Sequence, residues 1–158
     1  MEIFTVSFFG HRRIDRFAYA ERRVAELIGG LLREKEYVDF LVGRDGEFDT
    51  IVSSAIRRAK QNIFDANSSH ICILPYERAE YRDNVEEFEK YYDEIEICEK
   101  SAKAYMKAAI GIRNECMIDR SDLCIFYVTN NSGGAYSALQ YAKKQNKEIV
   151  NIADEEKY

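Results

Sequence analysis

Five short apolar runs, separated by segments with helical spacing, constrain the fold of this chain more than any other feature of its sequence. The runs are rich in β-branched and aromatic residues, and most are apolar on consecutive positions, as strands covered on both faces require. Each run predicts one β-strand. They are IFTVSFF (3–9), YVDFLV (37–42), HICILP (70–75), DLCIFYV (122–128) and EIVNI (148–152).

Three of the segments between these runs have the periodicity of amphipathic helices, with apolar residues three and four positions apart. The apolar positions are Val24, Leu27, Ile28, Leu31 and Leu32, then Phe48, Ile51, Val52, Ala55 and Ile56, and finally Ala135, Ala138, Leu139 and Ala142. Alternating strands and helices predict a three-layer, Rossmann-like α/β domain whose mainly parallel sheet has about five strands and helices on both faces. We expect residues 1–158 to form this one domain.

One connection, residues 76–121, is much longer than the others. DNVEEFEKYYDEI (83–95) predicts one helix and SAKAYMKAAIGIRNECM (101–117) another, and IEIC (95–98) leaves room for a short strand. The connection also carries Tyr91, Tyr92 and Tyr105. These rings could cover the domain's own core or form a two-fold interface.

Charge and composition restrict the partners. The formal net charge of −5 argues against nucleic acid, which is bound through clustered lysine and arginine, although a local basic patch would be compatible with it. The four cysteines form no C-x-x-C motif and there are only two histidines, so we expect no metal, no cofactor and no disulfide framework. No apolar stretch approaches the roughly 20 residues that span a bilayer. The N-terminus also lacks the order of charges of a signal peptide, so we expect a cytoplasmic protein without a membrane partner.

Glycine-containing loops follow the first, second and fourth predicted strands: GHRRI (10–14), GRDGEFD (43–49) and TNNSGG (129–134). Ligands of parallel sheets bind beyond the carboxyl ends of the strands, and glycines beside basic residues there favour a phosphate-bearing, nucleotide-like ligand. The alternative is that the glycines only close turns and that Arg12, Arg13 and Arg44 are solvated. The candidate binding residues are Gly10, His11, Arg12, Gly43, Arg44, Gly46, Asp49, Ser132, Gly133 and Gly134.

Two of these loops suggest particular contacts. Gly133 and Gly134 would let the backbone approach a phosphate, with helix N–H groups and the Ser132 hydroxyl as donors. Asp45 and Asp49 flank the expected start of a helix, where a carboxylate either caps backbone N–H groups or holds a ribose hydroxyl. We expect Asp45 to be the cap and Asp49 to be available to a sugar.

Arg113 interrupts the apolar stripe of the helix predicted after Ser101. A buried guanidinium needs a carboxylate or a bound anion, because burying it unpaired costs several kcal/mol. Its partner could be internal, for instance Asp119 or Asp122. It could equally be a ligand phosphate or substrate, which a guanidinium binds with two parallel hydrogen bonds.

The stretch RNECMIDRSDLCIFYVTNNSGGAYSAL (113–139) resembles the core signature of the SLOG superfamily, Rossmann-like proteins that include the LOG phosphoribohydrolases and the DNA-processing Smf proteins. The arginine, methionine, Ser-Asp pair and glycines of the LOG motif correspond to Arg113, Met117, Ser121, Asp122 and Ser132-Gly133-Gly134. The loops FFGHRRI and GRDGEFDTIVSSAIRRAK resemble those of the superfamily more loosely. The resemblance implies a bacterial branch of small, single-domain SLOG proteins, and it favours a homodimer.

The chain departs from the LOG motif at the catalytic glutamate, which works with the arginine to hydrolyse the N-glycosidic bond of nucleoside 5′-monophosphates. Gln140 occupies that position. An amide neither accepts a proton effectively nor stabilises an oxocarbenium-like centre with negative charge. If catalysis occurs, Arg113 would orient the phosphate or substrate, and a carboxylate would have to come from Asp49, Asp119 or Glu115.

Three functions follow. We favour a sensor or regulatory module that binds a nucleotide or nucleotide derivative and thereby changes an interaction with a protein partner. The alternative is a nucleotide N-glycosidase, a phosphoribohydrolase-like hydrolase with a departed active site. A DNA-handling role like that of the Smf relatives ranks third, because the chain is acidic.

Overall fold

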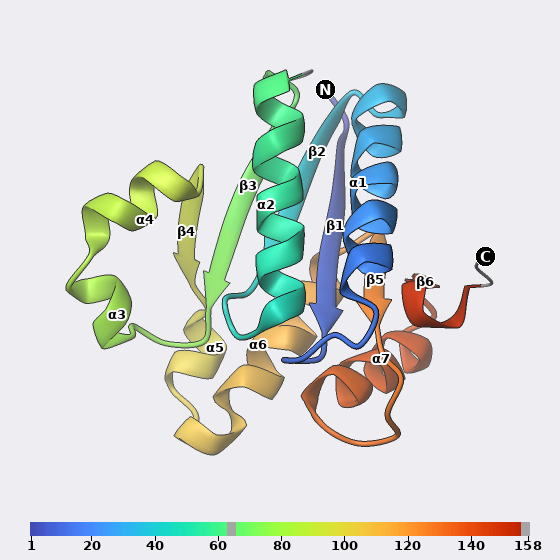
Figure 1. Cartoon of the computed structure of the whole chain (residues 1–158). Helices are drawn as coiled ribbons and strands as arrows, with labels where there is room; N and C mark the ends of the chain where they lie inside the picture. Colours follow the sequence, from blue (N-terminus) through green and yellow to red (C-terminus); the bar gives the residue numbers. More distant parts are fainter. Residues whose placement is uncertain (63–65, 156–158) are drawn as a thin grey trace.

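Six parallel strands form the centre of the protein in the computed structural model, which describes residues 1–62 and 66–155 (Figure 1). The strands are β1 (Ile3–Gly10), β2 (Tyr37–Val42), β3 (Ser68–Leu74), β4 (Glu94–Ile97), β5 (Leu123–Tyr127) and β6 (Glu148–Asn151). Their order across the sheet is β4-β3-β2-β1-β5-β6, and every pairing is parallel. The predicted fold class is confirmed.

Helices cover both faces of this sheet (Figure 1). The long helices α1 and α2 pack on one face and α6 and α7 on the other. Successive strand residues point to opposite faces, so Phe8 joins the core beneath α1 and α2 while Phe9 joins the core beneath α6 and α7. This double burial explains the continuous apolar runs in the sequence. The helices are α1 (Phe17–Glu34), α2 (Glu47–Asn62), α3 (Ala79–Arg82), α4 (Val85–Tyr91), α5 (Glu99–Ala102), α6 (Met106–Arg120), α7 (Gly134–Lys144) and the 3-10 turn η1 (Ile152–Asp154).

The sheet has one strand more than the predicted five. β4 lies in the long connection and pairs with β3 at the edge of the sheet. The expected helix over residues 83–95 ends at Tyr91, because the Glu-Ile-Glu-Ile alternation that follows has the two-residue period of a strand with one exposed face. The helix expected over residues 101–117 is likewise divided into α5 and α6.

The three tyrosines singled out in the long connection differ in their burial. Tyr92 is only 4% exposed, and Tyr91 packs against the same core with its ring centroid 4.9 Å from that of Tyr92. Tyr105 is 87% exposed at the start of α6. Two of the three rings therefore cover the domain's own core, and the homodimer stays a prediction.

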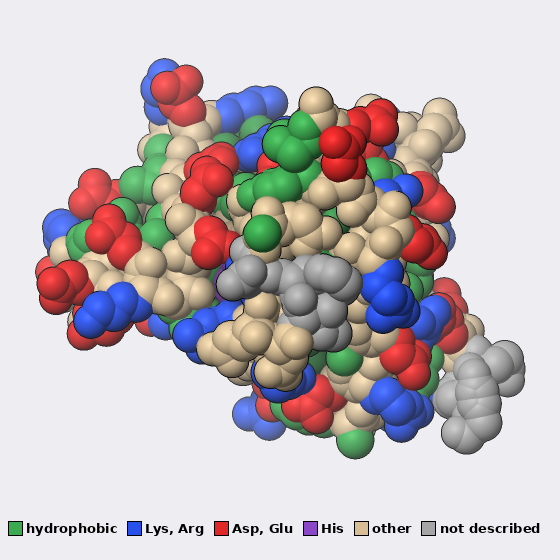
Figure 2. All heavy atoms as spheres, turned by 90° about the horizontal axis from the view of Figure 1, so that it is seen from above, with side chains coloured by type: hydrophobic (Ala, Val, Ile, Leu, Met, Phe, Trp, Pro, Cys, Tyr) green, Lys and Arg blue, Asp and Glu red, His purple; other side chains and the backbone are tan. Residues whose placement is uncertain are grey.

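The chain reverses its direction of winding at β1. β2 pairs with one side of β1 and β5 with the other, where Gly10 lies opposite Tyr127 at the carboxyl end. Open parallel sheets bind ligands at such a switch point. The opposite, amino end of the sheet is seen in Figure 2, where basic and acidic side chains are interspersed.

Candidate functional site

A cavity of about 680 Å³ opens at the carboxyl ends of β1, β2 and β5. The loops after these three strands line it together with the inner face of α6, so residues from distant parts of the chain meet there. Nine residues selected from the sequence are among its lining residues, which agrees with the predicted convergence of the loops. They are Gly10, His11, Arg12, Gly43, Asp49, Arg113, Ser132, Gly133 and Gly134.

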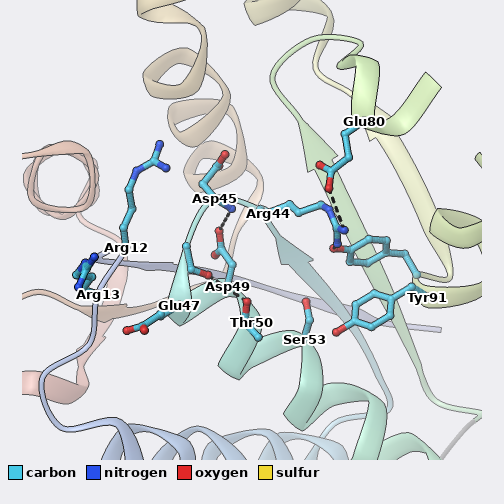
Figure 3. A pocket seen from close by; sticks show the side chains of 13 residues that line it. Arg12, Arg13, Arg44, Asp45, Glu47, Asp49, Thr50, Ser53, Glu80 and Tyr91 are labelled. Carbon is cyan, nitrogen blue, oxygen red and sulfur yellow. Dashed lines mark hydrogen bonds and ion pairs between the residues drawn. The ribbon is translucent and has the colours of Figure 1, made fainter. Parts of the chain in front are cut away.

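A second hollow of about 520 Å³ adjoins this cavity over the start of α2 (Figure 3). Arg44 and Gly46 line the second hollow instead of the central cavity. Arg44 is turned toward α3 and β4, where it pairs with Glu80 at 3.2 Å, donates to the Tyr92 hydroxyl at 3.0 Å and lies over the Phe88 ring. Arg44 and Arg12 therefore line only this side hollow together, and their role in binding stays a prediction.

The start of α7 forms the wall of the cavity beyond β5. Gly133 has a φ of +96°, a conformation that a residue with a side chain rarely adopts, and α7 begins at the next residue. Within the described part of the chain, no side chain caps this helix. The first N–H groups of a helix have no partner inside it and attract anions. Because Gly133, Gly134 and Ala135 all line the cavity, these donors lie at its edge.

Two arginines add positive charge to the cavity. Arg12 and Arg13 follow β1, are exposed and line both hollows (Figure 3). Neither has an ion-pair partner among residues 1–62 and 66–155. Arg13 was not among the candidate residues, although its position beside Arg12 in the loop GHRRI was the available indication.

Arg113 is buried, with 3% of its side chain exposed, and its guanidinium is held by internal partners. It donates from Nη2 to Asp45 Oδ2 at 2.8 Å and from Nη1 to the Ile73 carbonyl at 2.7 Å, and Nε donates to Asn114 Oδ1 at 3.0 Å. Of the two predicted alternatives, the structure shows the internal ion pair, but the carboxylates suggested as partners of Arg113 were wrong.

The two suggested carboxylates are engaged elsewhere. Asp119 accepts a hydrogen bond from the Tyr141 hydroxyl at 2.8 Å, and Asp122 accepts one from the Thr5 N–H at 2.9 Å. Asp119 lies near the end of α6 and Asp122 just after it, at the amino end of the sheet. The Arg113 guanidinium instead contacts β3 and the loop after β2, so neither carboxylate can reach it. The actual partner comes from a loop 68 positions earlier in the chain, which helix periodicity does not indicate.

Asp45 connects two arginines. It pairs with Arg113 at 2.8 Å and with Arg78 at 2.6 Å, and its side chain is 17% exposed. Burial alone would raise the pKa of Asp45, but the charges and hydrogen bonds of Arg113 and Arg78 hold it below its usual value. The expected capping role for Asp45 was wrong, because its carboxylate is used in this network.

Asp49, in the first turn of α2, binds the backbone of the loop before the helix. Its Oδ2 accepts a hydrogen bond from the Asp45 N–H at 2.7 Å, and the side chain lines both hollows (Figure 3). Burial raises the pKa of Asp49 to about 6, assisted by the neighbouring charge of Asp45 and opposed by the hydrogen bond from the backbone. Asp49 therefore changes its charge close to neutral pH.

His11 links two of the loops. Its Nε2 accepts hydrogen bonds from the N–H groups of Thr129 at 2.9 Å and Asn130 at 3.3 Å, which requires a lone pair on this nitrogen. Partial burial lowers the pKa of His11, although the charge of Asp15 opposes the effect. The neutral imidazole thus joins the loop after β1 to the loop after β5.

Gly10 has a packing role in addition to its place beside the cavity. A Cβ atom at this position would collide with the Phe48 side chain of α2. The glycine thus lets α2 lie close to the end of β1, and this accounts for Gly10 without a ligand.

Of the carboxylates suggested as substitutes for the LOG glutamate, only Asp49 lines the cavity among the described residues. Glu115 is exposed on α6, and Asp119 pairs with Tyr141. Gln140 is exposed on α7 and does not line the cavity either. Of the three suggested carboxylates, Asp49 is therefore the one placed for acid–base chemistry in the cavity.

Two further properties concern partners. In the described part of the chain, no group of three or more His, Cys, Asp and Glu side chains is placed to hold a metal ion. None of the described helices has the length and apolar character needed to cross a membrane.

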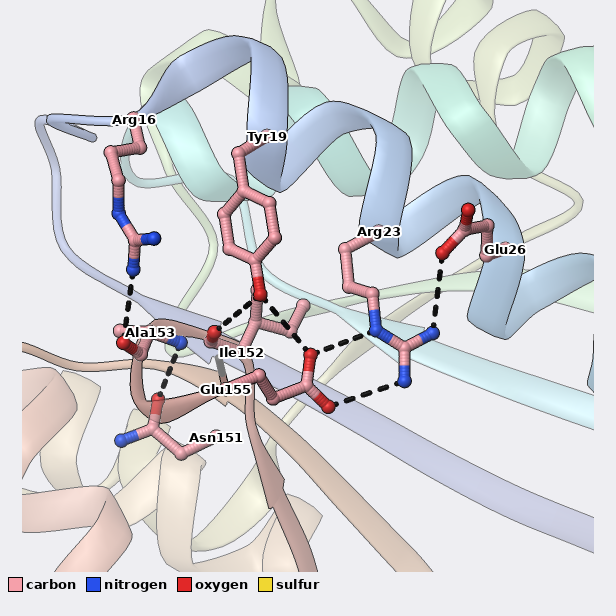
Figure 4. A network of polar contacts seen from close by, with 8 residues as sticks. All are labelled: Arg16, Tyr19, Arg23, Glu26, Asn151, Ile152, Ala153 and Glu155. Carbon is pink, nitrogen blue, oxygen red and sulfur yellow. Dashed lines mark hydrogen bonds and ion pairs between the residues drawn. The ribbon is translucent and has the colours of Figure 1, made fainter. Parts of the chain in front are cut away.

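A second polar network lies outside the cavity, where α1 meets the segment after β6 (Figure 4). Arg23 contacts both carboxylate oxygens of Glu155, at 2.8 and 3.2 Å, and Tyr19 donates to the Ile152 carbonyl at 3.0 Å. Arg16 donates to the Ala153 carbonyl at 2.9 Å. We call this set of contacts the C-terminal clasp, because it holds residues 152–155 against α1.

Solved structures with the same arrangement of elements exist. DNA processing protein A from Helicobacter pylori, described for its unique single-stranded DNA binding mode, aligns with a TM-score of 0.64 and 19% identity over 92% of this chain. DNA processing protein A (DprA) from Streptococcus pneumoniae aligns with a TM-score of 0.65 and 15% identity over 93% of this chain. The chain has the fold of DprA.

A third structure, that of the protein TM1055, aligns with a TM-score of 0.61 and 14% identity over 92% of this chain and 72% of its own length. This chain spans only 63% and 49% of the two DprA chains. No family model and no curated protein matches the sequence. These similarities support the Rossmann-like fold that the resemblance to the SLOG superfamily implies.

Proposed function

We propose that the protein binds a nucleotide or nucleotide-derived ligand in the cavity at the carboxyl edge of the sheet. One observation carries this proposal: the uncapped start of α7 opens into the cavity in which three glycine-containing loops meet. A helix N-terminus at the switch point of a parallel sheet is a favourable site for a phosphate group. The cavity volume of about 680 Å³ lies in the usual range for small-molecule sites.

The cavity offers a distinct partner for each part of such a ligand. The N–H groups of α7 and the Ser132 hydroxyl would donate to the phosphate, and Arg12 and Arg13 would supply positive charge that no carboxylate among the described residues neutralises. Asp49 would accept a hydrogen bond from a sugar hydroxyl. Arg113 would hold the cavity wall through Asp45, because its guanidinium already has three internal acceptors.

A regulatory role fits this site better than catalysis. Gln140 stands where the LOG motif has its glutamate, and it is exposed outside the cavity. We propose that ligand binding orders the loops after β1 and β5, which His11 joins, and that a protein partner or a second copy of the chain recognises the ordered form. The protein partner and the homodimer are parts of the proposal.

A nucleotide N-glycosidase is the second candidate, because of Asp49. This carboxylate lines the cavity, and its pKa of about 6 suits a group that exchanges a proton near neutral pH. In this alternative Asp49 would act as the acid or base and Arg113 would support the position of the substrate.

A ligand panel tests the proposal and separates the alternatives. Purified protein would be incubated with nucleoside monophosphates, the matching nucleosides and a single-stranded oligonucleotide, while thermal unfolding and release of free base are recorded. We expect nucleotides to raise the unfolding temperature, nucleosides to have a much smaller effect, and no base to be released. Base release that disappears in Asp49→Asn would favour the glycosidase. Stabilisation by the oligonucleotide alone would overturn the nucleotide proposal in favour of a DNA-handling role.

A further inference from the structure

Two of the four cysteines meet at the junction of β4, α5 and α6. Cys98 follows β4 directly, Cys116 lies on α6, and the two thiols are near enough for each to shift the pKa of the other. Both thiols are half-buried, whereas Cys72 and Cys124 are buried in the core. Neither Cys98 nor Cys116 lines the central cavity.

An ion pair fixes how the two elements face each other. Arg120 of α6 donates from Nη1 to Glu96 of β4 at 2.8 Å. Cys98 follows Glu96 by two residues of extended chain, and Cys116 precedes Arg120 by four residues of helix. Two extended residues advance about 6.6 Å and four helical residues about 6 Å. The register that pairs Arg120 with Glu96 therefore also brings Cys116 opposite Cys98.

The surroundings of Cys98 favour its thiolate. Partial burial opposes ionisation, but polar interactions with Ser101, with the Cys116 thiol and with the Lys100 backbone lower the pKa of Cys98 overall. Burial raises the pKa of Cys72 to about 12 and that of Cys124 to about 11. Because the thiolate is the reactive form of cysteine, Cys98 is the thiol that should react first.

We propose that Cys98 and Cys116 are a redox-responsive pair that a hydroperoxide converts into an intramolecular disulfide. The Cys98 sulfur attacks a peroxide oxygen and the O–O bond breaks, which gives a sulfenic acid at Cys98 and one molecule of water from hydrogen peroxide. The Cys116 sulfur then displaces the sulfenic oxygen as a second water and forms the S–S bond. The two thiols together lose two electrons and two protons, and one hydrogen peroxide is reduced to two waters.

The bond would connect the edge of the sheet to a wall of the central cavity. α6 carries four of the lining residues, Ile110, Arg113, Asn114 and Met117. Oxidation would add a covalent link between α6 and β4 to the ion pair of Arg120 with Glu96. The pair would thereby restrict the movement of α6 relative to the sheet whether or not a nucleotide is bound.

Thiol counting and mass spectrometry test this proposal on the full chain. After treatment with hydrogen peroxide and quenching, titration in denaturant should find two thiols where the untreated protein has four, and the mass should fall by two hydrogen atoms. Proteolysis should yield one linked pair of peptides, containing Cys98 and Cys116, and dithiothreitol should restore all four thiols.

Two variants sharpen the result. In Cys116→Ser the sulfenic acid has no thiol to react with, so dimedone should label Cys98; in the control Cys124→Ser the disulfide should still form. Four thiols remaining after peroxide treatment would overturn the proposal. Linkage through Cys72 or Cys124, or between two chains, would overturn it equally.

Discussion

Two arginine–carboxylate networks of this protein differ in what surrounds them. In the cavity wall, Asp45 lies between Arg113 and Arg78, and the Arg113 side chain is only 3% exposed. In the C-terminal clasp, Arg23 and Glu155 make an equally short contact of 2.8 Å, but about 30% of each side chain is exposed (Figure 4). The Arg113–Asp45 and Arg23–Glu155 distances are both 2.8 Å, so burial distinguishes these two pairs.

Burial changes what each pair contributes. Water can replace Glu155 as the partner of the partly exposed Arg23. Arg113 is almost fully buried, so removing its carboxylate would leave an uncompensated charge. The cavity network is therefore an obligatory part of the structure around the proposed ligand site, and the clasp contributes only modestly.

The largest effect is expected for Asp45→Ala. The substitution leaves Arg113 buried without its carboxylate, which should lower the free energy of unfolding by about 3–5 kcal/mol. Urea unfolding monitored by circular dichroism would measure the change. Asp119→Ala is the matched control, because it removes an exposed carboxylate near the end of α6. A loss under about 1 kcal/mol for Asp45→Ala would mean that water compensates Arg113 after all.

An intermediate effect should appear in the pH dependence of Asp49→Asn. Folding raises the pKa of Asp49 from 3.8 to about 6, so the protonated form is favoured in the fold. The contribution of Asp49 to stability is thus fully present below about pH 3.8 and is lost as the pH rises through about 6. Between about pH 3.8 and neutral pH, the free energy of unfolding of the wild type should therefore fall by about 1–3 kcal/mol relative to that of Asp49→Asn.

Denaturant unfolding across this pH range would test that expectation, and Glu115→Gln, an exposed carboxylate on α6, is the matched control. Parallel pH profiles for wild type and Asp49→Asn would show that Asp49 is not held in a protonated form by the fold.

The smallest effect is expected for Arg23→Ala in the clasp. An ion pair with this exposure should contribute about 0.5–1 kcal/mol to the free energy of unfolding, and less as salt screens the charges. Measurement in low and high salt would reveal both the size and the screening. A loss as large as that of Asp45→Ala would remove the distinction between the two networks.

These networks also show where sequence reasoning reached its limit. The apolar runs and helical periodicities predicted the layers, because both are local properties of the chain. The strand β4 was left out of the count of about five, although a short strand near residues 95–98 was allowed for, since Glu94–Ile97 is short and has only two apolar residues.

The same limit applies to the site. The convergence of the three glycine loops followed from the rule for parallel sheets, and the need of Arg113 for a partner followed from its place on an apolar stripe. The identity of that partner did not, because Asp45 is joined to Arg113 by tertiary packing and no spacing along the chain indicates it. For the same reason, the contacts of Asp45 with the two arginines and of Asp49 with the Asp45 N–H were visible only in three dimensions.

The central claim is that a phosphate group binds at the start of α7, and Gly134→Val tests it most directly. Apart from the neighbouring residues and the backbone of the same helix, no described atom lies within 4 Å of a Cβ placed on Gly134, and the same is true of Gly111 on α6. A side chain should therefore be tolerated by the fold at both positions, but only Gly134 lines the cavity. We predict that Gly134→Val abolishes the thermal stabilisation by nucleoside monophosphates while Gly111→Val retains it. Equal stabilisation of both variants by nucleotide would contradict the claim.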